Sequence, residues 1–175
     1  MAISNKAIFF DRDGTLIKSR IIDGKLLAFR DIFDFNIATD ARKILLELKS
    51  RGYKLILVTN QPDVSRGLVT KFFVDNINEF LKMHLELDLI KVVYQLEEDD
   101  PERYKPAPGM LLEAAAELDL DLEKSYMVGD RWRDIDAGKN ANCKTILINS
   151  QNIEGIRQNP DFEIDELAEL LKIIY

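Results

Sequence analysis

The chain has 175 residues, with 24 basic and 31 acidic side chains that give a formal net charge of −7. This length suffices for the core of one domain without disulfides, whereas the acidic balance opposes attraction to nucleic acid and no apolar run is long enough to span a membrane. The single cysteine, Cys143, cannot form an internal disulfide. We therefore expect one cytoplasmic domain, residues 1–175, that binds neither nucleic acid nor a membrane.

The first predicted element is a strand at residues 6–10, whose apolar and aromatic residues lead into two carboxylates, Asp11 and Asp13. Residues two apart in an extended chain project to the same side, so both carboxylates would lie at the strand's carboxyl end. A divalent cation is one way to keep both ionised, and a polar turn with incidental acids is the alternative. Residues 16–36 lack a helical period and carry an Asp-Gly turn signal, which predicts a flap or hairpin.

Strands and helices alternate along the rest of the chain. Five helices are predicted. The first follows a cap at Thr39 or Asp40 and ends at residue 51, and the second runs from Thr70 to about residue 87; the third ends at about residue 118, the fourth ends at residue 139, and the fifth starts at residue 165. Strands are predicted at 54–58, 90–96, 125–128, 145–148 and 162–164. In the second helix we expect Phe73, Ile77, Phe80, Leu81 and Leu85 to face inward. This alternation favours a doubly wound, Rossmann-like α/β/α sandwich of three layers with a mostly parallel sheet.

The unusual polar residues of the chain all follow predicted strands: Asp11, Asp13, Thr59, Asn60, Lys105, Asp130 and Asp134. The carboxyl ends of parallel strands meet at one edge of a sheet, so we expect these residues to converge in one site. Carboxylates and carbonyls without clustered Cys or His suit a hard cation such as Mg²⁺. Lys and Thr beside such a cation suit phosphate oxygens, and together these groups describe phosphoryl transfer.

Four motifs in this order resemble the signatures of the haloacid dehalogenase superfamily of phosphatases, and the resemblance covers nearly the whole chain. The motifs are Asp11-Arg12-Asp13-Gly14-Thr15, then Thr59, then Lys105, then Gly129-Asp130 with Asp134. The resemblance implies that Asp11 is the nucleophile, which forms an aspartyl-phosphate, and that Asp13 is first the general acid and then the base for water.

The same resemblance implies the binding roles. Mg²⁺ would be bound by the Asp11 carboxylate, the backbone carbonyl of Asp13 and the Asp130 carboxylate, while Asp134 would bind the metal or orient the groups that do. Thr59 and Lys105 would hold the phosphoryl oxygens.

Details of the loops resemble the small, capless branch of the superfamily, which contains heptose 1,7-bisphosphate and histidinol-phosphate phosphatases. These details are Thr59-Asn60-Gln61 with Arg66-Gly67, Lys105-Pro106 with Pro108-Gly109, and Met127 to Asp130. The resemblance implies a small phosphate ester as substrate, with residues 16–36 covering the site in place of a cap domain. Asn60, Arg66 and Arg131 are further candidate substrate contacts, and we expect a monomer or a small homo-oligomer.

Two places depart from that branch. Many of its members carry a zinc loop of Cys and His, but residues 96–103 are acidic here and contain neither ligand type, so we expect no zinc. Tyr104 stands where the heptose enzymes typically have Arg, which removes a bidentate phosphate contact. Arg131 stands where they usually have Lys, and it can reach a remote phosphate or a sugar hydroxyl.

Four other residues have less specific interpretations. We interpret Trp132 as a packing aromatic rather than a stacking platform, Cys143 as a small buried hydrophobe, and His84 as a surface or interface residue of a helix. Arg103 fits ligand contact and neutralisation of the acidic loop equally well.

A receiver-type signalling domain is the main non-enzymatic alternative. Such a domain is also doubly wound, phosphorylated on Asp with Mg²⁺, and equipped with Thr and Lys. Here, however, the candidate nucleophile follows the first strand, and Asp13 at the second position beyond it suits rapid hydrolysis.

Overall fold

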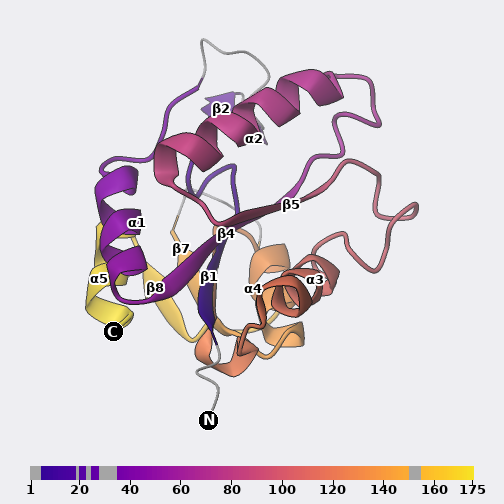
Figure 1. The fold of residues 1–175 in the computed structure, drawn as a ribbon. Coiled ribbons are helices and arrows are strands. Elements are labelled where there is room, and N and C mark those ends of the chain that lie inside the picture. Colours follow the sequence, from indigo (N-terminus) through magenta and orange to yellow (C-terminus); the bar gives the residue numbers. More distant parts are fainter. Residues whose placement is uncertain (1–4, 19, 23–24, 28–34, 150–154) are drawn as a thin grey trace.

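The computed structural model describes residues 5–18, 20–22, 25–27, 35–149 and 155–175 (Figure 1). Its parallel sheet has six strands in the spatial order β5-β4-β1-β6-β7-β8, and a separate pair of strands, β2 and β3, is antiparallel. The strands are β1 Lys6–Phe10, β2 Arg20–Ile22, β3 Lys25–Leu27, β4 Tyr53–Asn60, β5 Leu89–Val93, β6 Tyr126–Gly129, β7 Lys144–Ile148 and β8 Phe162–Ile164. The predicted doubly wound α/β class is confirmed.

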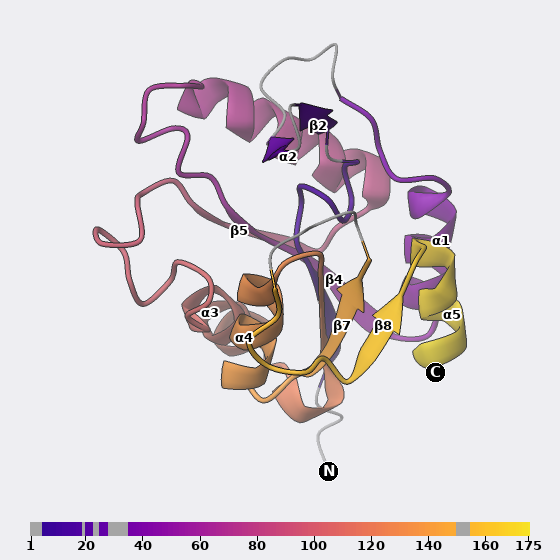
Figure 2. The same ribbon diagram turned by 180° about the vertical axis from the view of Figure 1, so that it is seen from behind.

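Helices cover both faces of the sheet (Figures 1 and 2). They are α1 Ala41–Ser50, α2 Lys71–Leu85, α3 Gly109–Leu118, α4 Trp132–Asn140 and α5 Leu170–Ile173, with short 3₁₀ turns at Leu122–Lys124 and Leu167–Glu169. Alternate residues of β1 explain the three layers: Ile8 and Phe10 belong to the apolar cluster under α1, α2 and α5, whereas Ala7 and Phe9 belong to the cluster under α3 and α4. A strand buried on both faces is apolar throughout.

The helix ends agree with the sequence in one case and not in another. The Thr70 side chain accepts a hydrogen bond from the backbone N–H of Phe73, as predicted for the cap of α2. Asp40 precedes α1 in a left-handed conformation, and its side chain makes no capping hydrogen bond. Phe80 was wrongly expected to face inward: it is 43% exposed, and Val74 completes the buried face of α2 instead.

The segment after β1 begins with a tight turn. The backbone N–H of Gly14 donates to the carbonyl of Ile17 at 2.7 Å, and Ile17 forms an isolated antiparallel bridge with Ile37. Strands β2 and β3 lie between these points as the predicted hairpin, and both ribbon views place β2 beside α2 beyond the carboxyl ends of the sheet strands. The Asp-Gly turn signal falls outside the described residues, and the division of the chain into one domain with a flap stays a prediction.

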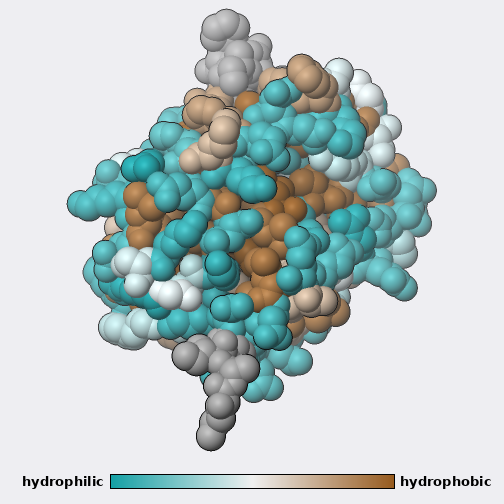
Figure 3. All heavy atoms as spheres, viewed as in Figure 1, coloured by the Kyte–Doolittle hydropathy of each residue, from teal (hydrophilic) through white to brown (hydrophobic). Residues whose placement is uncertain are grey.

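Apolar side chains gather across the middle of one face of the molecule (Figure 3), where the edge strand β5 runs in Figure 1. Lys91 lies within this strand and pairs with Glu117 at 2.7 Å. A charged residue on an edge strand disfavours the addition of another strand.

Within the described ranges, no helix combines the length and the apolar character needed to cross a membrane.

Candidate active site

Asp11 is the first residue beyond β1, and its backbone N–H donates to the carbonyl of Val128 on β6 at 3.0 Å. This bond places its carboxylate where the two central strands end. Asp130 follows β6 and Asp134 lies in the first turn of α4. Carboxylate oxygens of Asp11, Asp130 and Asp134 lie within 4.8 Å of one another, and all three residues are buried. The structure thus brings together the three carboxylates that the sequence placed at one sheet edge.

Lys105 joins this cluster as its cation. Its Nζ donates to Oδ1 of Asp11 and to Oδ1 of Asp134, both at 2.7 Å, and to the carbonyl of Val58 at 2.9 Å. Asn60 holds the backbone of Lys105 through a donated bond of 3.0 Å and an accepted bond of 3.1 Å. Asn60 therefore positions the lysine, and its contact with substrate stays a prediction.

The ionisation of the cluster is strongly shifted. Burial raises the pKa of Asp11 to about 6; Lys105 opposes this rise, and the nearby charges of Asp134 and Asp13 add to it. Burial alone would lower the pKa of Lys105, but the carboxylates of Asp11 and Asp134 hold it above its ordinary value. Lys105 is therefore a permanent cation beside a carboxylate that ionises near neutral pH.

Two glycines allow the carboxylates to approach the backbone. A Cβ on Gly14 would lie 2.1 Å from Oδ2 of Asp130, and one on Gly129 would lie 2.3 Å from Cβ of Asp134. Gly14 also has a φ of +93°, which other residues rarely adopt. The glycines of the first and fourth motifs are thus needed for close packing around the acids.

Asp13 occupies a different environment. Its Oδ2 accepts hydrogen bonds from Nε and Nη2 of Arg12 at 3.1 and 3.0 Å and from Nε2 of Gln61 at 2.8 Å. The same Nε2 of Gln61 donates to Oγ1 of Thr59 at 2.9 Å. Thr59 is buried. One amide group, that of Gln61, therefore contacts both Thr59, the candidate phosphate ligand, and Asp13, the candidate proton donor.

The other candidate substrate contacts lie apart from these groups. Arg66 pairs with Asp63 at 3.1 Å, and its side chain is half exposed. Arg131 donates its backbone N–H to Oδ2 of Asp134 at 3.0 Å, and this bond orients the acid from behind. Contact of either arginine side chain with a substrate stays a prediction.

The four residues with less specific interpretations make packing or ion-pair contacts or lie on the surface. Trp132 is buried, with the guanidinium of Arg157 3.4 Å from its ring centroid. Cys143 is buried, and this burial raises the pKa of its thiol to about 12. His84 lies exposed on α2, and Arg103 pairs with Glu113 at 2.6 Å. None of these contacts calls for a ligand.

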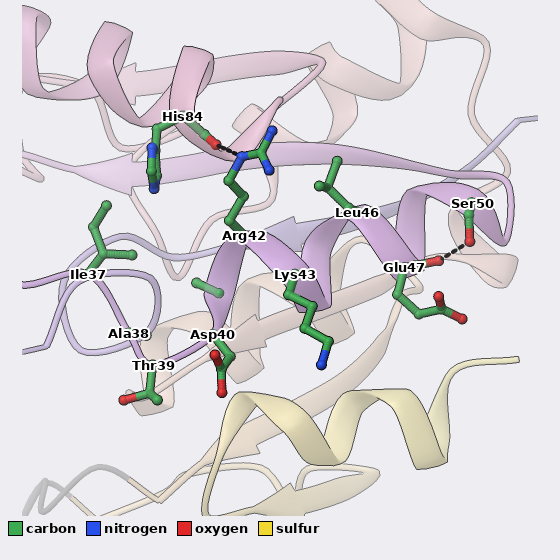
Figure 4. A pocket seen from close by; sticks show the side chains of 11 residues that line it. Ile37, Ala38, Thr39, Asp40, Arg42, Lys43, Leu46, Glu47, Ser50 and His84 are labelled. Atoms are coloured by element: carbon green, nitrogen blue, oxygen red, sulfur yellow. Dashed lines mark hydrogen bonds between the residues drawn. The ribbon is translucent and has the colours of Figure 1, made fainter.

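A groove of about 730 Å³ lies away from the acids, along α1 and the residues just before it, from Ile37 to Ser50 (Figure 4). Arg42 crosses it and donates to the carbonyl of His84 at 3.0 Å and to Glu86 at 2.9 Å. None of the residues predicted for the site lines this groove. Its size alone therefore does not mark it as the place of chemistry.

The sequence did not predict the residues that hold Asp13, namely Arg12 and Gln61, which bond to it, and Asn78, which bonds to Arg12. The detectable signal was a polar residue at position 78 of a helix face otherwise formed by Val74, Ile77, Leu81 and Leu85. Such a residue is expected to hydrogen-bond to something buried.

The family model of the haloacid dehalogenase-like hydrolases matches residues 36–142, more than half of the chain. The chain belongs to this family. Its curated relatives include the D-glycero-beta-D-manno-heptose-1,7-bisphosphate 7-phosphatase of Helicobacter pylori, which is 35% identical over 158 residues and 87% of each chain. The protein of the same name from Escherichia coli is 32% identical over 189 residues, covering 99% of this chain and 96% of the relative. Family and relatives together make the chain a phosphoric monoester hydrolase.

A solved structure has the same fold. It is the D,D-heptose 1,7-bisphosphate phosphatase of B. bronchiseptica complexed with magnesium and phosphate, with a TM-score of 0.80 and 23% sequence identity over 96% of this chain and 97% of that one. The expected superfamily is therefore confirmed by sequence, and its fold by structure.

Proposed function

We propose that the protein is a Mg²⁺-dependent phosphatase that hydrolyses a phosphorylated sugar, heptose 1,7-bisphosphate, through an aspartyl-phosphate on Asp11. The names of its relatives support the substrate. The mechanism rests chiefly on the contact of Lys105 with Asp11 at 2.7 Å, inside a buried cluster with Asp130 and Asp134. This contact holds a nucleophilic carboxylate and a phosphate-binding cation in one place.

The residues of the cluster fit a magnesium ion. Three buried carboxylates lie together, and Lys105 contacts two of them, Asp11 and Asp134. Their oxygen atoms are the donors that Mg²⁺ prefers. Asp11, Asp130 and the backbone carbonyl of Asp13 would hold the metal, which would supply positive charge beside the phosphoryl oxygens. Both oxygens of Asp134 are engaged, by Lys105 and by the backbone of Arg131, so Asp134 orients the cluster.

The reaction consists of two phosphoryl transfers, first to Asp11 and then to water. A carboxylate oxygen of Asp11 forms a bond to phosphorus while the ester oxygen departs with its electron pair and takes a proton from Asp13. A water molecule then gives a proton back to Asp13, attacks phosphorus and releases phosphate, which restores the Asp11 carboxylate. Lys105 and Thr59 contact the phosphoryl oxygens in both transfers and offset the charge that develops there.

The test is a phosphate-release screen with heptose 1,7-bisphosphate, histidinol phosphate and nucleotides, each with Mg²⁺ and with a chelator. We expect the heptose ester to give the highest kcat/KM and the chelator to abolish turnover. Preference for histidinol phosphate would reassign the substrate within the same branch, and activity that survives chelation would contradict the metal role.

Asp11→Asn tests the nucleophile, because an amide cannot form the acyl phosphate. We expect turnover to fall below detection, whereas Asp119→Asn, on an exposed residue at the end of α3, should leave it unchanged. Full turnover in Asp11→Asn would refute the mechanism. A phosphoryl-aspartate that persists for hours in the unmodified chain would instead favour the receiver alternative. Cytoplasmic location, the absence of zinc and the monomeric or small oligomeric state stay predictions.

A further inference from the structure

A series of buried polar side chains joins the middle of α2 to Asp13. Asn78 Oδ1 accepts a hydrogen bond from Arg12 Nη1 at 3.1 Å, and Arg12 Nη2 donates to Oε1 of Gln61 at 2.8 Å. Arg12 and Gln61 then meet at Oδ2 of Asp13. The exposed fractions of Arg12, Gln61 and Asn78 are 1%, 4% and 3%.

These buried groups are not what core stability alone would favour. A fully buried guanidinium costs several kcal/mol in lost hydration, and replacing buried ion pairs by well-packed apolar residues is often neutral or stabilising. Asn78 likewise interrupts the apolar face formed by Val74, Ile77 and Leu81. The network converges on one carboxylate, so its effect is to fix that carboxylate.

The two carboxylate oxygens of Asp13 differ in their hydrogen-bond partners. Oδ2 faces the N–H groups of Arg12 and Gln61, whereas Oδ1 is buried and has no hydrogen-bond partner among the described residues. Three N–H donors converge on Oδ2 and hold it in place. The network therefore fixes the orientation of the whole Asp13 carboxylate.

We infer that Arg12, Gln61 and Asn78 are positioning residues that hold the Asp13 carboxylate in the orientation in which it exchanges a proton with the leaving group and with water. The inference rests on the proposed function, in which Asp13 is the general acid. Gln61 extends the effect, because its Nε2 also donates to Thr59 and so sets the phosphate ligand and the proton donor relative to each other. Asn78 is the anchor of the network in α2, 66 residues from Arg12 along the chain.

Leaving-group dependence tests this role. An alkyl alkoxide needs a proton as it departs, whereas 4-nitrophenolate does not, and kcat/KM reports the steps up to that departure. We would measure kcat/KM for propyl, phenyl and 4-nitrophenyl phosphate. In Asn78→Ala we expect a loss of about 10-fold or more for the propyl ester and less than about threefold for the nitrophenyl ester, a part of the 10²–10⁴-fold that general acids typically contribute.

Two comparisons make the readout specific. Asn76→Ala changes an exposed asparagine of the same helix, so all three esters should react at the unmodified rate. Asp13→Asn should give the steepest dependence on the leaving group, and adding Asn78→Ala to it should cause no further loss, since Asn78 acts only through Asp13. Gln61→Ala removes the other partner of the same guanidinium and should reproduce the steepening even where Asn78→Ala fails to fold.

The outcomes separate this inference from the function on which it rests. An equal loss for all three esters in Asn78→Ala and Gln61→Ala, or no loss, would overturn the positioning role while the unmodified chain remains a phosphatase. A further loss from Asn78→Ala in the Asp13→Asn background would overturn it as well. No phosphate release by the unmodified chain from any of these esters or from heptose 1,7-bisphosphate would overturn the proposed function and this inference together.

Discussion

The acid cluster at the sheet edge and the groove at α1 both hold close ion pairs, but they differ in hydration. In the cluster, Lys105 and Asp134 are 2.7 Å apart and their side chains are each 3% exposed. At the groove, Arg42 and Glu86 are 2.9 Å apart, yet their side chains are 51% and 44% exposed. Nearly equal distances therefore describe two very different interactions.

This difference is why we assign the chemistry to the acid cluster and not to the groove. Water screens the pair at the groove, so the pair contributes about 1 kcal/mol at most and constrains little. Charges in the cluster have lost most of their water, so each depends on the others for its ionisation. Depleted hydration and mutual dependence of charges mark a catalytic site better than the volume of a hollow does.

Lys105→Met gives the largest expected effect and tests that dependence directly. Removing the ammonium leaves the carboxylates of Asp11 and Asp134 buried without a cation. We therefore expect the free energy of unfolding to fall by about 3–5 kcal/mol and turnover to be lost. Urea unfolding and phosphate release measure the two losses. Lys91→Met at the edge strand, where Glu117 is half exposed, should cost about 1 kcal/mol or less. Similar losses in the two variants would erase the contrast between buried and exposed charge.

Asp11→Asn should separate stability from activity as a function of pH. The folded pKa of Asp11, about 6, lies above its ordinary value of 3.8, so the folded state holds the proton more tightly. The stability of the unmodified chain therefore falls as pH rises from about 4 to 6, and Asn escapes this loss of about 3 kcal/mol.

Urea unfolding in chelator would detect this change. We expect the advantage of Asp11→Asn over the unmodified chain to grow between pH 4 and pH 8. A difference that is the same at both pH values would contradict the shifted ionisation of Asp11.

Gly14→Ala isolates the close approach to Asp130, with Gly52→Ala as its match. Both glycines have positive φ, +93° and +85°, so both variants carry similar backbone strain of about 1–2 kcal/mol. Only the new Cβ on Gly14 would meet a neighbour, Oδ2 of Asp130 at 2.1 Å, whereas that on Gly52 would meet none within 4 Å. We expect Gly14→Ala to lose about 1–3 kcal/mol more and most of its turnover. Equal unfolding midpoints and rates would show that the approach is unimportant.

Much of the sheet edge could be predicted because its information is local. Strand residues that are buried on both faces read as apolar runs, and the acids of the site stand directly after them, as Asp11 and Asp130 do. Parallel topology then brings together residues as distant as Asp11 and Lys105, which are 94 positions apart.

The rest depended on contacts that no local pattern specifies. Asn78 looked like one polar residue in a helix, and its meaning came only from Arg12 packing against it in the fold. Phe80 shared the apolar period of α2 but lies on its exposed side, where it packs edge-on against Phe35. Hydrophobic period alone did not determine which side of the helix was buried.

Arg42→Ala gives the smallest expected effect and tests the other side of the comparison. The guanidinium loses one exposed ion pair and one hydrogen bond to a helix-end carbonyl, so we expect a loss of about 1 kcal/mol or less and no change in phosphate release. Raising the ionic strength should shrink even this difference, because exposed charges are screened. A loss above about 2 kcal/mol that does not change with salt, or reduced turnover, would mean that the groove contributes to stability or to catalysis although its charges are hydrated.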